Sequence, residues 1–139
     1  MAATTVDRNT LVRGAIERQL VFDLPSGEDI PAGAIVCTNA SGDAKNGADT
    51  AGLICQGRAQ HRATYANGDR RIVVARGVFC YANDGTIVKA DIGGVCTILD
   101  NQTVSKAATT ANDIPAGIID DVTSEGVWVS MLGGKIAAT

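Results

Sequence analysis

The residue types that could perform catalysis are few in this chain, and they are not spaced for it. His61 is the only histidine, so a Ser-His-Asp triad would have to use it. The Gly-x-Ser-x-Gly turn that presents a nucleophilic serine is absent. Asp120 and Asp121 are adjacent, so on a strand their carboxylates point to opposite faces and cannot form an acid–base pair. The sequence therefore predicts a protein that is not an enzyme.

Motifs that would bind a cofactor, a metal or a planar ligand are also missing. The sequence has no phosphate-binding loop and no Gly-x-Gly-x-x-Gly. The Asn-Asp-Gly turn at residues 83–85 would bind calcium only weakly, because no loop has the EF-hand spacing. Aromatic residues make up only 4% of the chain and are scattered, which gives no stacking platform for a nucleic acid or a sugar. We therefore expect no cofactor and no metal.

The four cysteines are predicted to be buried free thiols. Cys37, Cys55, Cys80 and Cys96 form no Cys-x-x-Cys pair and match no zinc spacing. Each lies in an apolar context, as in Ala-Ile-Val-Cys-Thr for Cys37. The N-terminus has no basic and apolar signal region, so a reducing compartment is expected, in which cysteine acts as a small hydrophobe.

The composition indicates one β-rich domain that carries these residues. The chain has 139 residues, of which 45% are apolar and 19% charged. Valine, isoleucine and threonine outnumber the residues that favour helices, and 16 glycines against three prolines make glycine the main turn residue. The pI near 5.0 gives no reason to expect a nucleic-acid partner. No uncharged apolar run reaches 18 residues, so no membrane partner is expected.

Regular turn signals from residue 20 onward predict about ten short strands. Gly57 is expected to form a bulge, Gly77 to interrupt a strand, and residues 83–85 to close a hairpin between 78–82 and 86–89. This spacing predicts an all-β fold with a single compact sandwich or barrel domain at residues 20–139. The expected strands are 20–24, 34–38, 53–60, 71–76, 78–82, 86–89, 95–99, 103–106, 117–120 and 127–132.

Residues 1–19 are polar and weakly periodic, and are predicted to form an N-terminal extended arm. A short helix capped by Asn9, with Leu11, Ala15, Ile16 and Leu20 on one face, is the alternative, as is a frayed terminus. If the arm is ordered, we expect a partner to order it.

Charge is unevenly distributed along the sequence. Between Gly57 and Gly77 there are five arginines and only one acidic residue, Asp69, whereas acidic residues dominate after residue 107. Either alternating residues along the strands present these arginines to water, or a basic face meets an acidic face on a neighbouring subunit. The candidate subunit-interface residues are Arg58, Arg62, Arg70, Arg71, Asp120 and Asp121.

One pentapeptide occurs twice. Asp-Ile-Pro-Ala-Gly stands at residues 29–33 and again at 113–117, each time before an apolar run. Proline fixes φ and glycine permits a tight corner, so both copies are interpreted as structural corners, either duplicated or convergent.

The order of segments between Leu20 and Leu132 resembles the capsid decoration, or cement, proteins of tailed bacteriophages. No single segment is specific; the resemblance lies in their succession. The segments are Ile-Pro-Ala-Gly at 30–33, Ala-Gly-Leu-Ile-Cys-Gln-Gly at 51–57, Asn-Gly-Asp at 67–69, Ala-Arg-Gly-Val-Phe at 75–79, residues 85–93, Asp-Asn-Gln-Thr-Val at 100–104, Ile-Pro-Ala-Gly at 114–117 and Gly-Val-Trp-Val at 126–129.

This resemblance implies a structural virion protein on the outer capsid surface, assembled in the cytoplasm of a bacterial host. It would bind the expanded head, bridge neighbouring major capsid subunits and stabilise the shell against internal DNA pressure, as a homotrimer or a dimer. In the arm, Arg8, Arg13 and Arg18 would pair with acidic capsid residues, and Leu11, Val12 and Ile16 would fill apolar grooves. The alternatives are a small antifreeze-like β-clip module, which would bind carbohydrate or act as an accessory domain of an enzyme, and a phage tail or baseplate β-domain.

Overall fold

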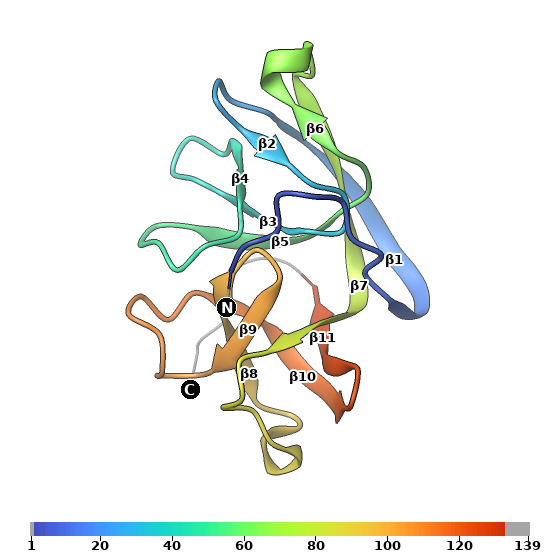
Figure 1. The fold of residues 1–139 in the computed structure, drawn as a ribbon, viewed down its shortest axis with the longest axis vertical. Helices are drawn as coiled ribbons and strands as arrows, with labels where there is room; N and C mark the ends of the chain where they lie inside the picture. The colour runs from blue at the N-terminus through green and yellow to red at the C-terminus, as the bar shows by residue number, and fades with distance from the viewer. Residues whose placement is uncertain (1, 133–139) are drawn as a thin grey trace.

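The computed structural model describes residues 2–132, and these form an all-β domain, as the sequence predicts (Figure 1). Two short 3-10 turns, η1 (Tyr65–Asn67) and η2 (Lys89–Asp91), are the helical elements within that range. The strands are β1 (Val12–Asp23), β2 (Asp29–Ile30), β3 (Ile35–Thr38), β4 (Ala44–Asn46), β5 (Ile54–Ala59), β6 (Ala63–Thr64), β7 (Arg71–Asn83), β8 (Val95–Asp100), β9 (Thr103–Lys106), β10 (Pro115–Thr123) and β11 (Gly126–Met131).

Strand β7 organises the fold, because it has a different set of neighbours at each end. Its second half pairs antiparallel with β11, and its last two residues pair in parallel with β9. Strands β11, β10, β8, β9 and β7 are bonded in succession and β11 returns to β7, so these five strands close into a small barrel. The first half of β7 pairs with β5 and β1, and β5 leads on to β3 and β4. Of the two architectures expected, the barrel is the one that forms.

Two apolar cores follow from this arrangement. The barrel core, in the lower half of Figure 1, is built around Phe79, Tyr81 and Ile98, which are fully buried. A second core in the upper half includes Ile30, Ile72 and Val74 from β2 and β7. Because β7 crosses both halves, Ile72 and Val74 near its start belong to the second core and Phe79 and Tyr81 near its end to the barrel core, so one strand holds the two cores together.

The N-terminal arm differs from the expectation. Strand β1 begins at Val12 and pairs with β7 from Val12 to Asp23, so the expected boundary after residue 19 falls inside a strand. The helical alternative is wrong, because these residues are extended. Most of β1 is exposed on both faces, which explains why residues 12–19 lack the alternation of apolar and polar residues that marks a half-buried strand.

Two further expectations around β7 are wrong. Residues 83–85 do not close a hairpin, because β7 runs on to Asn83 and pairs with β11 and β9, while residues 86–88 form no strand. Gly77 does not interrupt β7; it pairs with Met131. The missing side chain leaves room there for the Phe79 ring and for the Ala15 carbonyl of β1, which a Cβ would approach to 3.3 and 3.6 Å.

Other local expectations are confirmed. Gly57 lies at a register shift between β3 and β5 with φ of +146°, where a Cβ would collide with the Ala75 carbonyl oxygen. The four cysteines are free and buried. By contrast, the interpretation of both Asp-Ile-Pro-Ala-Gly copies as corners is wrong for the second copy. The chain turns after β2 in the first copy, whereas residues 115–117 of the second already lie within β10.

Candidate assembly surface

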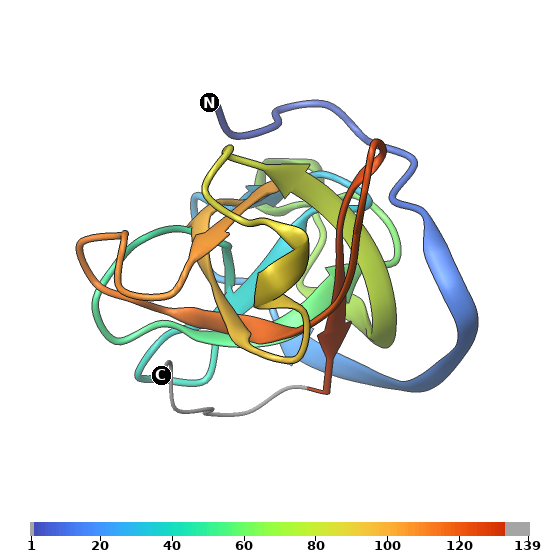
Figure 2. The ribbon, with the colours of Figure 1, turned by 90° about the horizontal axis from the view of Figure 1, so that it is seen from below.

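Strand β1 presents the longest exposed strand edge among the described residues. It pairs only with β7, so its other edge faces no strand within residues 2–132. Figure 2 shows β1 at the periphery of the molecule. A long edge with unpaired backbone groups is a surface to which another chain can add a strand.

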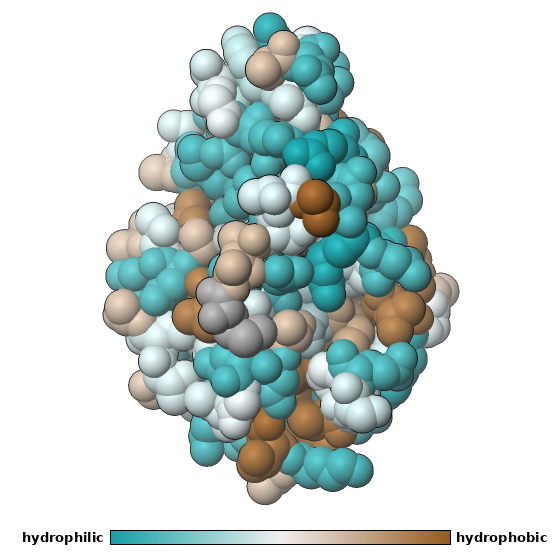
Figure 3. Space-filling view, in the orientation of Figure 1, coloured by the Kyte–Doolittle hydropathy of each residue, from teal (hydrophilic) through white to brown (hydrophobic). Residues whose placement is uncertain are grey.

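Exposed apolar side chains accompany this edge. Leu11, Val12, Ile16 and Val21 are all exposed. In Figure 3, hydrophobic surface is visible at the right, where Figure 1 places the lower end of β1. Several exposed apolar side chains beside an open edge make this strand a candidate interaction site.

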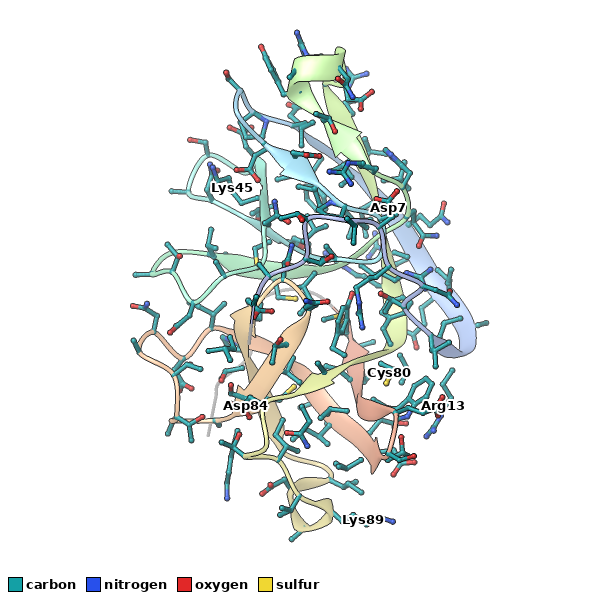
Figure 4. The ribbon with its side chains drawn as sticks, in the orientation of Figure 1. Asp7, Arg13, Lys45, Cys80, Asp84 and Lys89 are labelled. Atoms are coloured by element: carbon teal, nitrogen blue, oxygen red, sulfur yellow. The ribbon has the colours of Figure 1, made fainter. Side chains whose placement is uncertain are left out.

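A bulge in β1 is held against the barrel by Arg13. The register with β7 shifts between Arg13 and Arg18, where the six residues from Arg13 to Arg18 lie opposite only three residues of β7. The Arg13 guanidinium lies 4.1 Å from the centre of the Trp128 ring and forms an ion pair of 2.9 Å with Asp121 (Figure 4). The hydrogen bond from Arg13 lowers the pKa of Asp121.

The N-terminal segment, defined here as residues 2–11, lies on the domain itself. The Asn101 side chain accepts a hydrogen bond of 2.8 Å from the Thr4 N–H and donates one to the Thr4 carbonyl, as a neighbouring strand would. Asp7 accepts a hydrogen bond from the Ala32 N–H. The segment therefore lies against its own domain, in addition to any contact with a partner.

The anchor of this segment is Thr10, which is buried. Its hydroxyl donates to the Gly33 carbonyl at 2.6 Å, and the buried Tyr81 hydroxyl donates to the same oxygen at 2.8 Å. Arg8 donates to the Thr10 hydroxyl at 2.9 Å and lies over the Tyr81 ring. Sequence reasoning missed Thr10, and a single threonine in a polar stretch gives no signal of this role.

The six arm residues proposed for capsid binding thus fall into two groups. Arg8 faces the domain and Arg13 is occupied by Asp121 and Trp128, so neither is presented as a bare surface cation. The other four are exposed along β1 and the residue before it: Leu11, Val12, Ile16 and Arg18.

The candidate subunit-interface residues do not form one basic face. Arg62 pairs with Asp29 at 2.8 Å and with Asp7, and Arg71 lies 3.7 Å from Asp23. These acids come from the N-terminal part of the chain, so the excess of arginine in the sequence segment is partly balanced in space. The remaining residues are half-buried Arg58, Arg70 over the Tyr65 ring, exposed Asp120 and Asp121 beside Arg13.

Within residues 2–132, no group of three or more histidine, cysteine or acidic side chains is placed to hold a metal ion. No helix in that range is long and apolar enough to cross a membrane. Comparisons with protein-family models, with curated proteins and with solved structures find no match to the chain.

Proposed function

We propose that this chain is a structural virion protein that decorates the outer surface of an expanded tailed-bacteriophage head. It contacts the major capsid protein, bridges neighbouring subunits and stabilises the shell against DNA pressure. It acts as a homo-oligomer, a trimer in the first instance or a dimer. The succession of segments from Leu20 to Leu132 supports this proposal.

The observation that carries the proposal is the exposed edge of β1 with its apolar side chains. An edge of this length can accept a strand from a capsid subunit, and the apolar side chains beside it add buried area. One such contact is modest, but repetition over a whole shell makes the sum strong. The capsid-contacting residues of the arm are accordingly Leu11, Val12, Ile16 and Arg18.

Co-sedimentation with expanded, undecorated heads tests the proposal. The heads are assembled from the major capsid protein encoded in the same genome, and bound chains per head are counted. Wild-type chain is expected to saturate the heads and to raise their melting temperature. A chain that ignores heads and binds glycans instead would overturn the proposal in favour of a carbohydrate-binding module.

A pair of double variants then tests the surface. Ile16→Ser with Val21→Ser removes apolar groups that are 36% and 58% exposed in β1. Val88→Ser with Ile92→Ser removes groups of similar exposure, 54% and 44%, next to Lys89 at the opposite end of the molecule (Figure 4). We expect binding to weaken about tenfold or more in the first variant, by about 0.7 kcal/mol or more per lost side chain. Equal binding by both variants would contradict the role of β1.

A further inference from the structure

A small pocket lies where the N-terminal segment crosses β5. Its volume is about 190 Å³. The lining residues come from three stretches: residues 8–10 of the N-terminal segment, Ala32 and Gly33 before β3, and Arg58–Gln60 in and after β5. Arg8 and Arg58 therefore reach the same pocket from segments that are 50 residues apart in the sequence.

The two guanidinium groups are fixed in place. Arg8 Nη1 donates to the Thr10 hydroxyl at 2.9 Å, and Arg58 Nη1 donates to the Thr10 carbonyl at 2.9 Å. Their planes rest on aromatic rings, with Arg8 5.0 Å from the Tyr81 centroid and Arg58 4.3 Å from the Phe79 centroid. Contacts of this kind hold a cation in one orientation before any ligand arrives.

These two charges have no acidic partner within residues 2–132. Arg58 donates to the Gln60 side chain and the Thr10 carbonyl, and Arg8 to the Thr10 hydroxyl and the Cys80 carbonyl, all of which are neutral acceptors. By contrast, Arg62, the next arginine after Arg58, forms ion pairs with both Asp7 and Asp29. Burial lowers the pKa of Arg58, yet the group keeps its charge, so a half-buried cation without an acidic partner lines the pocket together with Arg8.

Both arginines also have N–H donors that make no hydrogen bond within residues 2–132. A guanidinium has five N–H donors. Arg58 uses three of them, on Nε, Nη1 and Nη2, which leaves two. Arg8 uses two, both from Nη1, which leaves three. An acceptor that carries negative charge would satisfy these donors and give both cations an anionic partner.

We propose that this pocket is a binding site for a small oxyanion, a carboxylate or a phosphate group. The volume equals that of about six water molecules, which suits one such group and is too small for a nucleotide or a drug-sized ligand. The anion occupies the space between the Arg8 and Arg58 guanidinium groups and takes its hydrogen bonds from them. This site is independent of capsid binding.

Titrations followed by two-dimensional ¹H–¹⁵N NMR test the site. Inorganic phosphate, acetate and an end-capped Gly-Glu-Gly peptide are added separately at constant ionic strength. Saturable shifts are expected at the backbone amides of Thr10, Gly33 and Ala59 and at the Nε–H signals of Arg8 and Arg58. Binding of the capped peptide assigns the site to an acidic side chain from another protein, and binding of phosphate alone assigns it to a free anion.

Variants separate this site from general attraction of anions. Arg58→Gln is expected to weaken binding of the effective probe at least tenfold, whereas Arg71→Gln, which removes an exposed arginine outside the pocket, leaves binding unchanged. The Arg8 Nε–H signal of the wild-type chain gives a readout that needs no variant. Shifts that do not saturate, or equal affinity in wild type and Arg58→Gln, would overturn the proposal.

Discussion

At the scale of single residues, the Gly33 carbonyl joins the N-terminal segment to the barrel. It accepts hydrogen bonds from both Thr10 and Tyr81. Tyr81→Phe removes one of them and leaves the other, so the free energy of unfolding is expected to fall by about 1 kcal/mol. Urea denaturation measures this. Tyr65→Phe is the matched control, because the Tyr65 hydroxyl makes no hydrogen bond within residues 2–132; an equal loss in the control would refute the assignment.

The same tyrosine gives the protein a pH dependence at the alkaline end. Burial raises the pKa of Tyr81 above its usual value near 10. Above about pH 10 the unfolded chain releases this proton while the folded chain keeps it, so stability falls as pH rises. Between pH 9 and 11 the wild type is expected to lose about 1 kcal/mol more than Tyr81→Phe. Parallel stability curves for the two proteins would contradict this prediction.

Gly57, the glycine of β5, is predicted not to tolerate a side chain. Gly57→Ala forces a Cβ onto the Ala75 carbonyl as well as a positive φ, so a loss of about 3 kcal/mol or more is expected. Gly27→Ala is the control, since Gly27 has φ of +87° but open space around it, and only about 1–2 kcal/mol is expected there. Thermal unfolding of the two variants compares them directly.

At the scale of elements, the docking of β1 can be followed with a natural probe. Trp128 is the only tryptophan, and it lies under Arg13 of β1. Arg13→Ala is expected to shift its fluorescence to longer wavelength and to let β1 detach at a lower urea concentration than the barrel unfolds, as seen by circular dichroism. Arg71→Ala serves as the control. A single coincident transition in Arg13→Ala, with unchanged emission, would show that Arg13 does not hold β1.

Strands were predictable from sequence where most of their side chains are buried. The segments 95–99, 103–106 and 127–132 are strands within a residue or two of the expected bounds, because apolar residues and turn signals coincide there. The failures have physical reasons. Strand β1 is exposed on both faces and so has no hydrophobic pattern. Residues 83–85 have the sequence of a hairpin turn, but β7, which ends there, pairs with strands that are distant in the sequence.

The candidate surface was predictable only in part. The exposed arm residues Leu11, Val12, Ile16 and Arg18 follow from composition, because a polar stretch with isolated apolar residues does not bury them. The inward orientation of Arg8 and the pairing of Arg13 with Asp121 depend on contacts across 72 and 108 residues. Sequence patterns with a period of two or four residues carry no information over such distances.

At the scale of the whole molecule, the four thiols report on global unfolding. All are buried, and burial raises the pKa of Cys96 to about 12, which keeps that sulfur protonated and unreactive. At pH 8 we expect the native protein to react with an aromatic disulfide reagent only as fast as it unfolds, and the denatured protein to react at once at all four cysteines. Mass spectrometry counts the modified residues. Rapid labelling of the native protein would contradict the burial of these groups.

The central position of β7 also has a consequence for synthesis on the ribosome. Strand β1 is complete at Asp23, but its partner in the sheet begins only at Arg71. At about 5–20 residues per second, several seconds pass before β1 can pair, and β11, which closes the barrel against β7, emerges later still. Residues 12–23 carry two arginines, a glutamate and an aspartate among their apolar side chains. We expect these charges to oppose aggregation of the unpaired segment until β7 emerges from the ribosome.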